Sequence, residues 1–152
     1  ESGLSPSRLH LELTESAFAG DRRNIIPTLS KLREKGVKIS LDDFGTGYSC
    51  LADLRRLPLD NIKIDKSFVE SLETDSGPIV KVIIATAQTF GLQIVAEGVE
   101  TKAQAERLIG LGANYLQGYL FSGILSLQAA HDWVLARHPA LPKEMRSGVY
   151  LT

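Results

Sequence analysis

The stretch Lys38 to Leu51, KISLDDFGTGYSCL, constrains the fold of this chain more than any other. It begins with alternating apolar and polar residues, the period of two that predicts a β-strand. Two adjacent acids, Asp42 and Asp43, follow, and a turn containing Gly45 and Gly47 comes next. Two like charges side by side are unfavourable unless a positive charge lies near them. The stretch therefore predicts a strand that ends at a cation, for which a metal ion is the simplest candidate.

Size and composition fit one soluble globular domain. The chain has 152 residues, is 43% hydrophobic and carries 17 Lys and Arg against 18 Asp and Glu, for a formal net charge of -1. Such a charge would not steer the protein to a nucleic acid polymer. One cysteine excludes an internal disulfide, and no signal peptide or membrane-inserting run is found. We expect a cytoplasmic protein, or the cytoplasmic part of a membrane-anchored one. The first residue, Glu1, suggests a piece of a longer polypeptide.

Strand and helix patterns alternate along the chain, which predicts parallel βαβ units. Strands are expected at 9–15, 37–41, 61–65, 92–96 and 113–117. Helices are expected at 21–35, 51–57, 77–90, 101–109 and 126–138. The fourth carries Ala105, Leu108 and Ile109, and the last has Ala130, Trp133 and Val134 inward. The predicted domain covers residues 1–138, and residues 139–152 form a tail.

Polar residues stand at or just beyond the ends of all five expected strands. In a (β/α)8 barrel this is the face on which active sites are built from several strand ends. Polar residues at the corresponding ends of five successive strands predict a functional site. The residues are Glu12 and Glu15, Asp42 and Asp43, Lys63 and Asp65, Glu97 and Glu100, and Gln117.

Carboxylates with a carboxamide, and no clustered His or Cys, form a hard oxygen-donor site suited to Mg²⁺ or Mn²⁺. Adjacent acids such as Asp42 and Asp43 can serve two ions. Two ions about 3.5–4 Å apart clamp the attacking and leaving oxygens of a phosphoryl transfer. Lys63 would add a charge that holds water or a phosphate oxygen. The pattern indicates metal-assisted phosphodiester hydrolysis.

Ordinary structural interpretations of the same residues stay open at this point. An acid pair before a Gly-rich turn is often solvated turn chemistry. Lys63 and Asp65 share a strand face and could be a structural ion pair. Glu97 and Glu100 could favour the positive N-terminus of the helix that opens at Thr101. Gln117 alone is more often a hydrogen-bonding strand-end residue. Cys50 is expected to be a small semi-buried residue of the loop, and three histidines are expected to be surface or ordinary polar positions: His10, His131 and His138.

Five motifs carry a resemblance to a known family. LELTES, DDFGTGYSCL, IKIDKSFV, IVAEGVET and LQGYLFS, in this order, resemble the second part of the bacterial EAL domain, from about Leu4 to about Trp133. That family hydrolyses cyclic di-GMP to linear pGpG with Mg²⁺ or Mn²⁺. The resemblance implies an α/β fold, a TIM-barrel-like (β/α)8 EAL fold that is incomplete here, with about five βα units.

Roles for individual residues follow from the matching motifs. Metal binding is implied for Glu12, Asp42, Asp43 and Glu97, with two ions in a complete domain and Asp42 as the shared ligand. Lys63 would position the hydrolytic water, and Glu97 would also take part in base chemistry. Glu15 would steady the DDFGTG loop, and three residues would contact substrate or support the site: Asp65, Glu100 and Gln117. A loop would couple dimer contacts to the site: Phe44, Gly45, Thr46, Gly47, Tyr48 and Ser49.

Departures from the family pattern are equally clear. The Glu-Ala-Leu strand, the Asn-bearing strand after it and the first substrate-contacting strand have no counterpart in these 152 residues. Two expected metal ligands are therefore missing, and a closed barrel needs eight units. We expect an inactive isolated chain with exposed sheet edges. Cys50 replaces a usual serine, and Gly123-Ile124 replaces a basic residue and Pro.

Three functions compete. The first is a cyclic di-GMP phosphodiesterase of which this chain is the C-terminal part. The second is a catalytically inactive receptor for cyclic di-GMP, or a protein-interaction scaffold. The third, a Mg²⁺ enzyme of the enolase type, is disfavoured by the DDFGTGYS and AEGVET motifs. For the first, we expect a homodimer through residues 44–57 and fusion to sensory or GGDEF-type domains.

Overall fold

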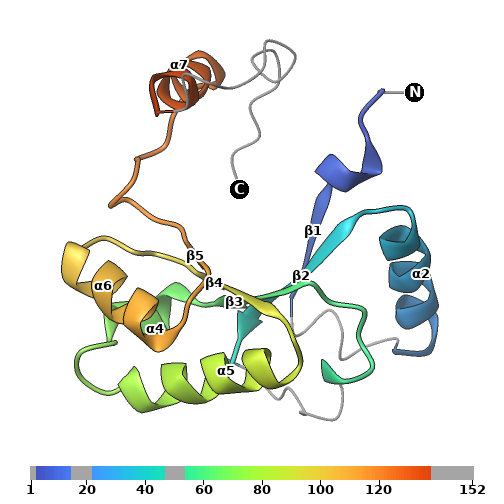
Figure 1. The fold of residues 1–152 in the computed structure, drawn as a ribbon, viewed down its shortest axis with the longest axis horizontal. Coiled ribbons are helices and arrows are strands. Elements are labelled where there is room, and N and C mark those ends of the chain that lie inside the picture. The colour runs from blue at the N-terminus through green and yellow to red at the C-terminus, as the bar shows by residue number, and fades with distance from the viewer. Residues whose placement is uncertain (1–2, 15–21, 47–53, 138–152) are drawn as a thin grey trace.

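A computed structural model describes residues 3–14, 22–46 and 54–137. Five parallel strands form one sheet in the order β1-β2-β3-β4-β5, with helices between them (Figure 1). The strands are β1 (His10–Thr14), β2 (Lys38–Phe44), β3 (Asn61–Ile64), β4 (Gln93–Ala96) and β5 (Tyr115–Leu116). The helices are η1 (Pro6–Arg8), α2 (Arg22–Glu34), α4 (Lys66–Glu70), α5 (Gly77–Thr89), α6 (Lys102–Leu111) and α7 (Leu127–Arg137).

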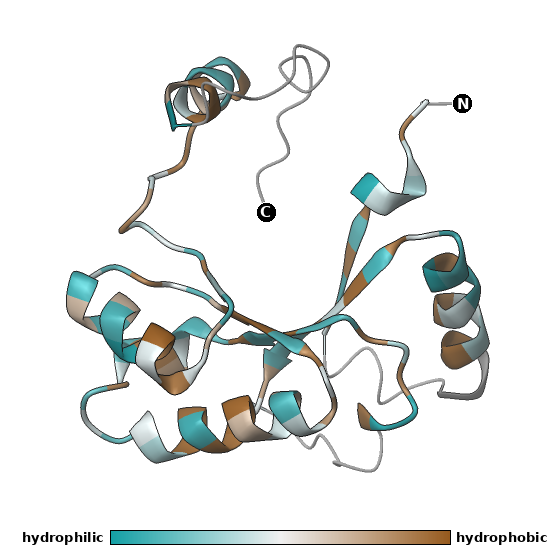
Figure 2. Ribbon diagram, viewed as in Figure 1, coloured by the Kyte–Doolittle hydropathy of each residue, from teal (hydrophilic) through white to brown (hydrophobic). Residues whose placement is uncertain are grey.

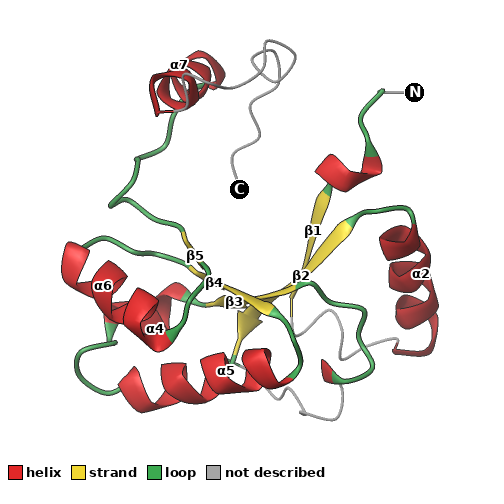
Figure 3. Cartoon of the chain, in the orientation of Figure 1, coloured by secondary structure: helices red, strands yellow, loops and turns green. Residues whose placement is uncertain are grey.

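This architecture confirms the predicted alternation of strands and helices. Helices α2, α5 and α6 surround the convex side of a curved sheet, whereas α7 stands apart on the concave side at the end of an extended arm (Figures 1 and 3). Two short helices, η1 and α4, were not expected. Residues 51–53 of the expected helix at 51–57 lie outside the described residues, and residues 54–57 form little more than a turn. Within the described residues, no helix is both long and apolar enough to cross a bilayer.

The hydrophobic core lies between the convex face of the sheet and the helices. Ile39 and Leu41 of β2 and Ile62 of β3 are at most 1% exposed, and α5 packs Val80 and Ile84 against them (Figure 2 shows the apolar strands and helix faces). Because side chains alternate along a strand, this leaves the intervening polar residues on the concave face. The core therefore orients the candidate site.

Helix α6 agrees only in part with expectation. Its capping box is confirmed, since Thr101 Oγ1 accepts from the Gln104 N–H and Gln104 Oε1 accepts from the Thr101 N–H. Of the apolar residues that the helix carries, Ala105 and Leu108 are buried, whereas Ile109 is 61% exposed. Gly110 does not end the helix. The helix continues to Leu111 and ends at Gly112, whose φ of 104° lies in the left-handed region.

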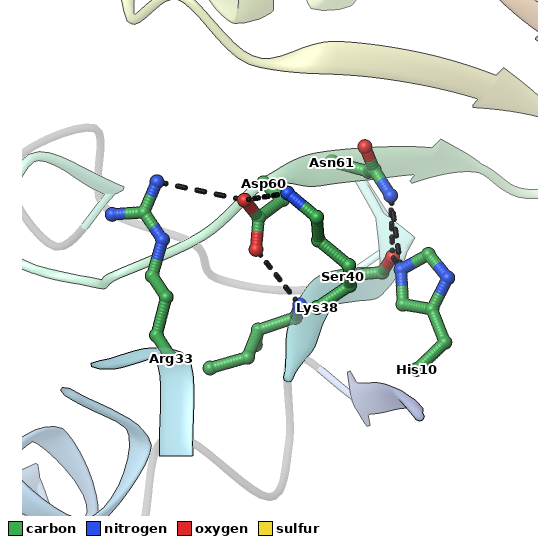
Figure 4. A network of polar contacts seen from close by, with 7 residues as sticks. His10, Arg33, Lys38, Ser40, Asp60 and Asn61 are labelled. Atoms are coloured by element: carbon green, nitrogen blue, oxygen red, sulfur yellow. Dashed lines mark hydrogen bonds and ion pairs between the residues drawn. The ribbon is translucent and has the colours of Figure 1, made fainter. Parts of the chain in front are cut away.

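Asp60 ties three elements together at the N-terminal edge of the sheet (Figure 4). Its carboxylate accepts from the Ile39 N–H at 3.0 Å and pairs with Lys38 at 3.1 Å and Arg33 of α2 at 3.5 Å. Burial pushes the pKa of Asp60 up. The hydrogen bonds from Ile39 and Lys38 and the charges of Arg33 and Lys38 outweigh it, so the pKa lies below its ordinary value of 3.8.

We expect Asp60→Ala to lower the free energy of unfolding by about 1–3 kcal/mol, because it leaves the Ile39 N–H without its acceptor. A folded pKa below the unfolded value means that this stabilisation is present above pH 3.8 and is lost as the pH falls through the folded pKa. Urea unfolding at pH 7 and pH 3 measures both effects. Asp75→Ala, at an exposed position, is the control; equal losses in both variants would contradict the prediction.

Gly118 permits a close approach of two backbone segments just after β5. A Cβ at this position would lie 2.3 Å from both the nitrogen and the oxygen of Val99. These segments are joined by Val99 N–H to Gln117 O at 3.0 Å and Leu120 N–H to Val99 O at 2.9 Å. The turn after β5 thereby supports the loop that carries Glu97.

Gly118→Ala should force these backbones apart and lower the free energy of unfolding by about 1–3 kcal/mol. The matched control is Gly110→Ala, since a Cβ there meets nothing within 4 Å. In a helix that change should stabilise the protein by about 0.5–1 kcal/mol. Thermal unfolding of the two variants tests the contrast, and a destabilised Gly110→Ala or a neutral Gly118→Ala would refute it.

Candidate functional site

The ammonium group of Lys63 lies among three carboxylates at the C-terminal ends of the strands. Its Nζ is 2.5 Å from Glu97 Oε1, 2.8 Å from Glu12 Oε1 and 3.4 Å from Asp42 Oδ1. The Lys63 side chain is only 7% exposed, while Glu12 is 46% exposed. We call these four residues the Lys63 cluster. The cluster unites β1, β2, β3 and the loop after β4, and sequence reasoning had predicted all four as site residues.

Strand geometry explains why these residues meet. Glu12, Asp42 and Lys63 each project from the concave side of the sheet, opposite the apolar residues that face the helices. Strands β1 and β3 are not neighbours, since β2 lies between them. Their side chains nevertheless touch across β2, because the sheet curves toward its concave face (Figure 1).

Burial and charge act in opposite directions on the pKa values of the cluster. Burial alone would lower the pKa of Lys63, but the hydrogen bonds to Glu12 and Glu97 and the nearby carboxylates raise it above its ordinary value. Burial raises the pKa of Glu97, Lys63 opposes this, and the charges of Asp42 and Glu12 add to the rise. The lysine therefore stays charged at neutral pH and compensates the acids around it.

The second acid of the pair adopts an unusual backbone. Asp43 has a φ of 54°, a left-handed conformation that few residues other than Gly adopt without cost. Its N–H donates to Asp42 Oδ1 at 3.0 Å. The register between β2 and β3 also shifts between Leu41 and Phe44. Regular pairing between β2 and β3 is therefore interrupted at the paired acids, while Asp42 stays paired with Thr14 of β1.

The predicted regulatory loop is only partly described. Phe44 is buried at 7% exposure, and Thr46 Oγ1 donates to the Asp43 carbonyl at 2.8 Å. A Cβ at Gly45 would lie 3.2 Å from the Ile83 side chain, and the φ of 97° at Gly45 itself favours glycine. Four predicted residues lie outside the described residues: Glu15, Gly47, Tyr48 and Ser49.

Three other predicted residues lie near the cluster but have different partners. Asp65 caps α4, where its Oδ1 accepts from the Ser67 N–H at 3.0 Å. Glu100 is exposed before α6, and its N–H donates to Gln104. Gln117 lines the same cleft as Glu12 and Lys63. The structure thus gives Asp65 a local capping role that its position two residues after Lys63 did not reveal.

A cleft of about 770 Å³ opens along the concave face. Side chains of the strands line one side of it, and residues of the arm after β5 with Trp133 of α7 line the other. Most charged and polar lining groups come from the strands, with Gln117 and Ser122 from the segment after β5. The aromatic and apolar lining residues are Val95, Tyr115, Leu116, Tyr119, Phe121, Ile124, Leu125 and Trp133.

A second polar group lies in the same cleft and was missed by sequence reasoning. His10 Nε2 is 2.8 Å from Ser40 Oγ, and Asn61 Nδ2 lies 3.0 Å from the same nitrogen and donates to Ser40 Oγ at 3.2 Å (Figure 4). Of the two expectations for His10, a surface or an ordinary polar position, the structure shows a partly buried polar position. The available signal was its spacing, two residues before Glu12 on the same strand.

The donor chemistry of the Lys63 cluster fits a hard divalent cation. Three carboxylates face one ammonium, so negative charge is left over, and carboxylate oxygens are ligands that Mg²⁺ and Mn²⁺ prefer. Within the described residues, however, no group of three or more His, Cys, Asp or Glu is placed to hold a metal ion together. The carboxylates converge on the lysine instead, so they would have to turn from it to bind a cation.

The sequence matches the family model described as "EAL domain" over residues 1–123. The chain belongs to the EAL domain family. It is 46% identical over 145 residues to the cyclic di-GMP phosphodiesterase NbdA of Pseudomonas aeruginosa, covering 93% of this chain. It is 45% identical to the probable cyclic di-GMP phosphodiesterase PdeB of Escherichia coli, covering 86%.

Solved EAL structures share the fold. A structure titled as the PaMucR phosphodiesterase in complex with c-di-GMP matches at 47% identity with a TM-score of 0.78, over 82% of this chain and 51% of that one. A manganese and cyclic di-GMP complex of Klebsiella pneumoniae BlrP1 matches at 35% identity with a TM-score of 0.72, over 80% of this chain and 31% of that one. These likenesses confirm the TIM-barrel-like α/β fold, present here in part.

The EAL chain spans only part of its relatives. It covers 18% of the length of NbdA, 25% of PdeB and about half of the solved MucR chain. The activities and ligands in the names and titles of these relatives are therefore those of proteins longer than this chain.

Replacing Lys63 should expose the repulsion among its carboxylates. We expect Lys63→Met to lower the free energy of unfolding by about 2 kcal/mol at pH 7, at the low end for a broken buried pair because Glu12 is half-exposed. Lowering the pH should recover part of the loss, since Glu97, whose pKa is raised, then takes up a proton. Denaturant unfolding between pH 4 and pH 8 measures this. Lys102→Met, at an exposed position of α6, is the control; a loss that does not depend on pH would contradict the prediction.

Proposed function

We propose that this chain forms part of a metal-dependent phosphodiesterase domain that hydrolyses cyclic di-GMP to linear pGpG. The observation that carries the proposal is the Lys63 cluster, with an ammonium and three carboxylates gathered on the face where barrel active sites are built. Membership of the EAL family supports it, because NbdA and PdeB are named as phosphodiesterases of this dinucleotide.

Each cluster residue has a role that suits its environment. Glu12, Asp42 and Glu97, together with Asp43, would hold Mg²⁺ or Mn²⁺, and two ions are proposed for a complete domain. A bound divalent cation neutralises phosphate charge and makes water a stronger nucleophile. Lys63 is held charged and nearly buried, so it would orient the attacking water or bind a phosphate oxygen.

Other predicted roles follow from the same proposal. The raised pKa of Glu97 suits a group that accepts a proton during the reaction. Gln117 lies in the cleft, where it would contact the dinucleotide. Glu15 and the loop at residues 44–49 are proposed to steady the metal-binding acids. The manganese and calcium complexes of BlrP1 with cyclic di-GMP support a divalent cation, while the choice of Mg²⁺ is our proposal.

A binding protein without catalysis is the second candidate. One observation favours it: the described carboxylates converge on Lys63 and are not arranged as a set of metal ligands. Such a domain would use the cleft and its aromatic wall to bind the dinucleotide. It would leave the phosphodiester bonds intact.

Assembly and location stay predictions. We propose a homodimer through residues 44–57, fusion to sensory or GGDEF-type domains, and a cytoplasmic location. The relative named as the bifunctional diguanylate cyclase and cyclic di-GMP phosphodiesterase MucR supports the fusion.

Hydrolysis of cyclic di-GMP separates the two candidates. We expect turnover in Mg²⁺ or Mn²⁺ by a version of the chain extended to full EAL-domain length, and none by the 152-residue chain alone. In the extended version, Lys63→Ala should reduce kcat about 10²–10³-fold. Product analysis by chromatography measures pGpG. Tight dinucleotide binding by the extended version without any product would refute the enzyme and support the receptor.

A further inference from the structure

The polar group His10, Ser40 and Asn61, which we call the polar triad, lies directly beneath the Lys63 cluster. Each member precedes a cluster residue by two positions on the same strand: His10 and Glu12 on β1, Ser40 and Asp42 on β2, Asn61 and Lys63 on β3. A spacing of two places both members of each pair on the same face. The concave face therefore carries two stacked polar layers drawn from the same three strands.

The triad joins β1 to β3, which do not pair with each other. The 3.0 Å contact between Asn61 and His10 crosses β2, as the ion pair between Lys63 and Glu12 does above it. Ser40 is only 1% exposed and contacts both partners. The lower layer thus sets how closely β1 and β3 approach across β2, which is the separation that the upper layer needs.

Backbone pairing between β2 and β3 is interrupted at the height of the cluster. Ser40 lies opposite Asn61 and Leu41 opposite Ile62, and then the register shifts before Phe44 pairs with Ile64. Asp42 lies inside that irregular stretch on the β3 side, although it stays paired with Thr14 of β1. The triad therefore ties the three strands together immediately below the point at which β2 and β3 lose their register.

The triad also carries a cost that an apolar core would avoid. The Oδ1 of Asn61 is buried and has no hydrogen-bond partner in the described structure. A buried acceptor without a partner is destabilising, and an apolar side chain of similar shape would remove the penalty. Stability alone does not account for a polar residue here.

We propose that the polar triad positions the Lys63 cluster, so that His10, Ser40 and Asn61 are positioning residues for the site. The inference rests on the proposed function only in taking the cluster as the catalytic centre. The triad fixes the spacing of β1, β2 and β3, and this spacing holds the Lys63 ammonium against Glu12 and Glu97.

The test measures how well Lys63 is held, without any need for activity. Acetic anhydride labels free lysine amines, and mass spectrometry compares the labelling rate of Lys63 with that of exposed Lys102 in the same sample. Asn61→Leu should speed the labelling of Lys63 about threefold or more, the smallest change expected for coupled neighbours. The thermal midpoint of Asn61→Leu should be no lower than that of the unaltered chain, because the variant lacks the buried Asn61 Oδ1 that has no hydrogen-bond partner.

A matched asparagine provides the control. Asn114 Oδ1 accepts from the Ile94 N–H at 2.8 Å and joins β4 to the segment before β5, away from the triad. Asn114→Leu should lower the thermal midpoint and leave Lys63 labelling unchanged. If the triad were purely structural, Asn61→Leu would likewise lower the thermal midpoint and leave Lys63 labelling unchanged. That result would overturn the proposal.

A second pair of variants covers the case in which Asn61→Leu does not fold. His10 is only partly buried, so His10→Phe keeps a ring of similar shape while it removes the contacts to Ser40 and Asn61. It should also speed Lys63 labelling, and His10→Gln, which returns a polar amide, should restore part of the protection. Equal labelling in His10→Phe, His10→Gln and the unaltered chain would overturn the proposal.

Calorimetric titration with Mn²⁺ separates this inference from the proposed function. Failure of the extended EAL domain to bind Mn²⁺ would count against the metal site that the function requires. The labelling rates would still decide whether the triad holds Lys63. Where Mn²⁺ does bind, Asn61→Leu should weaken its affinity by about the same factor as it speeds labelling.

Discussion

The Lys63 ammonium is the charge around which the concave face is arranged. Three carboxylates from different segments lie within ion-pair distance of it, and without a cation their mutual repulsion would oppose the curvature that brings them together. The apolar residues of the same strands hold the sheet against its helices from the other side. The electrostatic site and the hydrophobic core are therefore two faces of one set of strands.

This arrangement has a consequence for metal binding. A lysine at the centre of a carboxylate group gives the acids a partner of their own, so their close approach does not require a metal ion. A divalent cation would have to compete with that ammonium or bind beside it, using the negative charge that one lysine leaves uncompensated. When the cation binds, the carboxylates would exchange the Lys63 ammonium for the metal ion. Lys63 would then be free to contact water or phosphate.

A second layer of polar side chains lies below the Lys63 cluster on the same strands. In many barrels the interior layers below the active site are filled by branched apolar side chains. Here His10, Ser40 and Asn61 occupy such a layer and cross-link three strands below the irregular end of β2. Directional hydrogen bonds specify spacing more narrowly than apolar contacts do, at the expense of an orphan acceptor on Asn61.

Local periodicity and turn chemistry are enough to predict the βαβ order, the approximate strand positions and the polar residues at the strand ends. Because the carboxyl ends of parallel strands share an edge, the same patterns predict Glu12, Asp42, Lys63 and Glu97 in one site. Which of these charges pair depends on the curvature of the folded sheet. The partner of Lys63 is not Asp65, two residues away, but acids from three other segments, because sheet curvature brings side chains together across an intervening strand. The same curvature makes His10 a partner of Ser40 and Asn61, and its spacing from Glu12 does not by itself identify these partners.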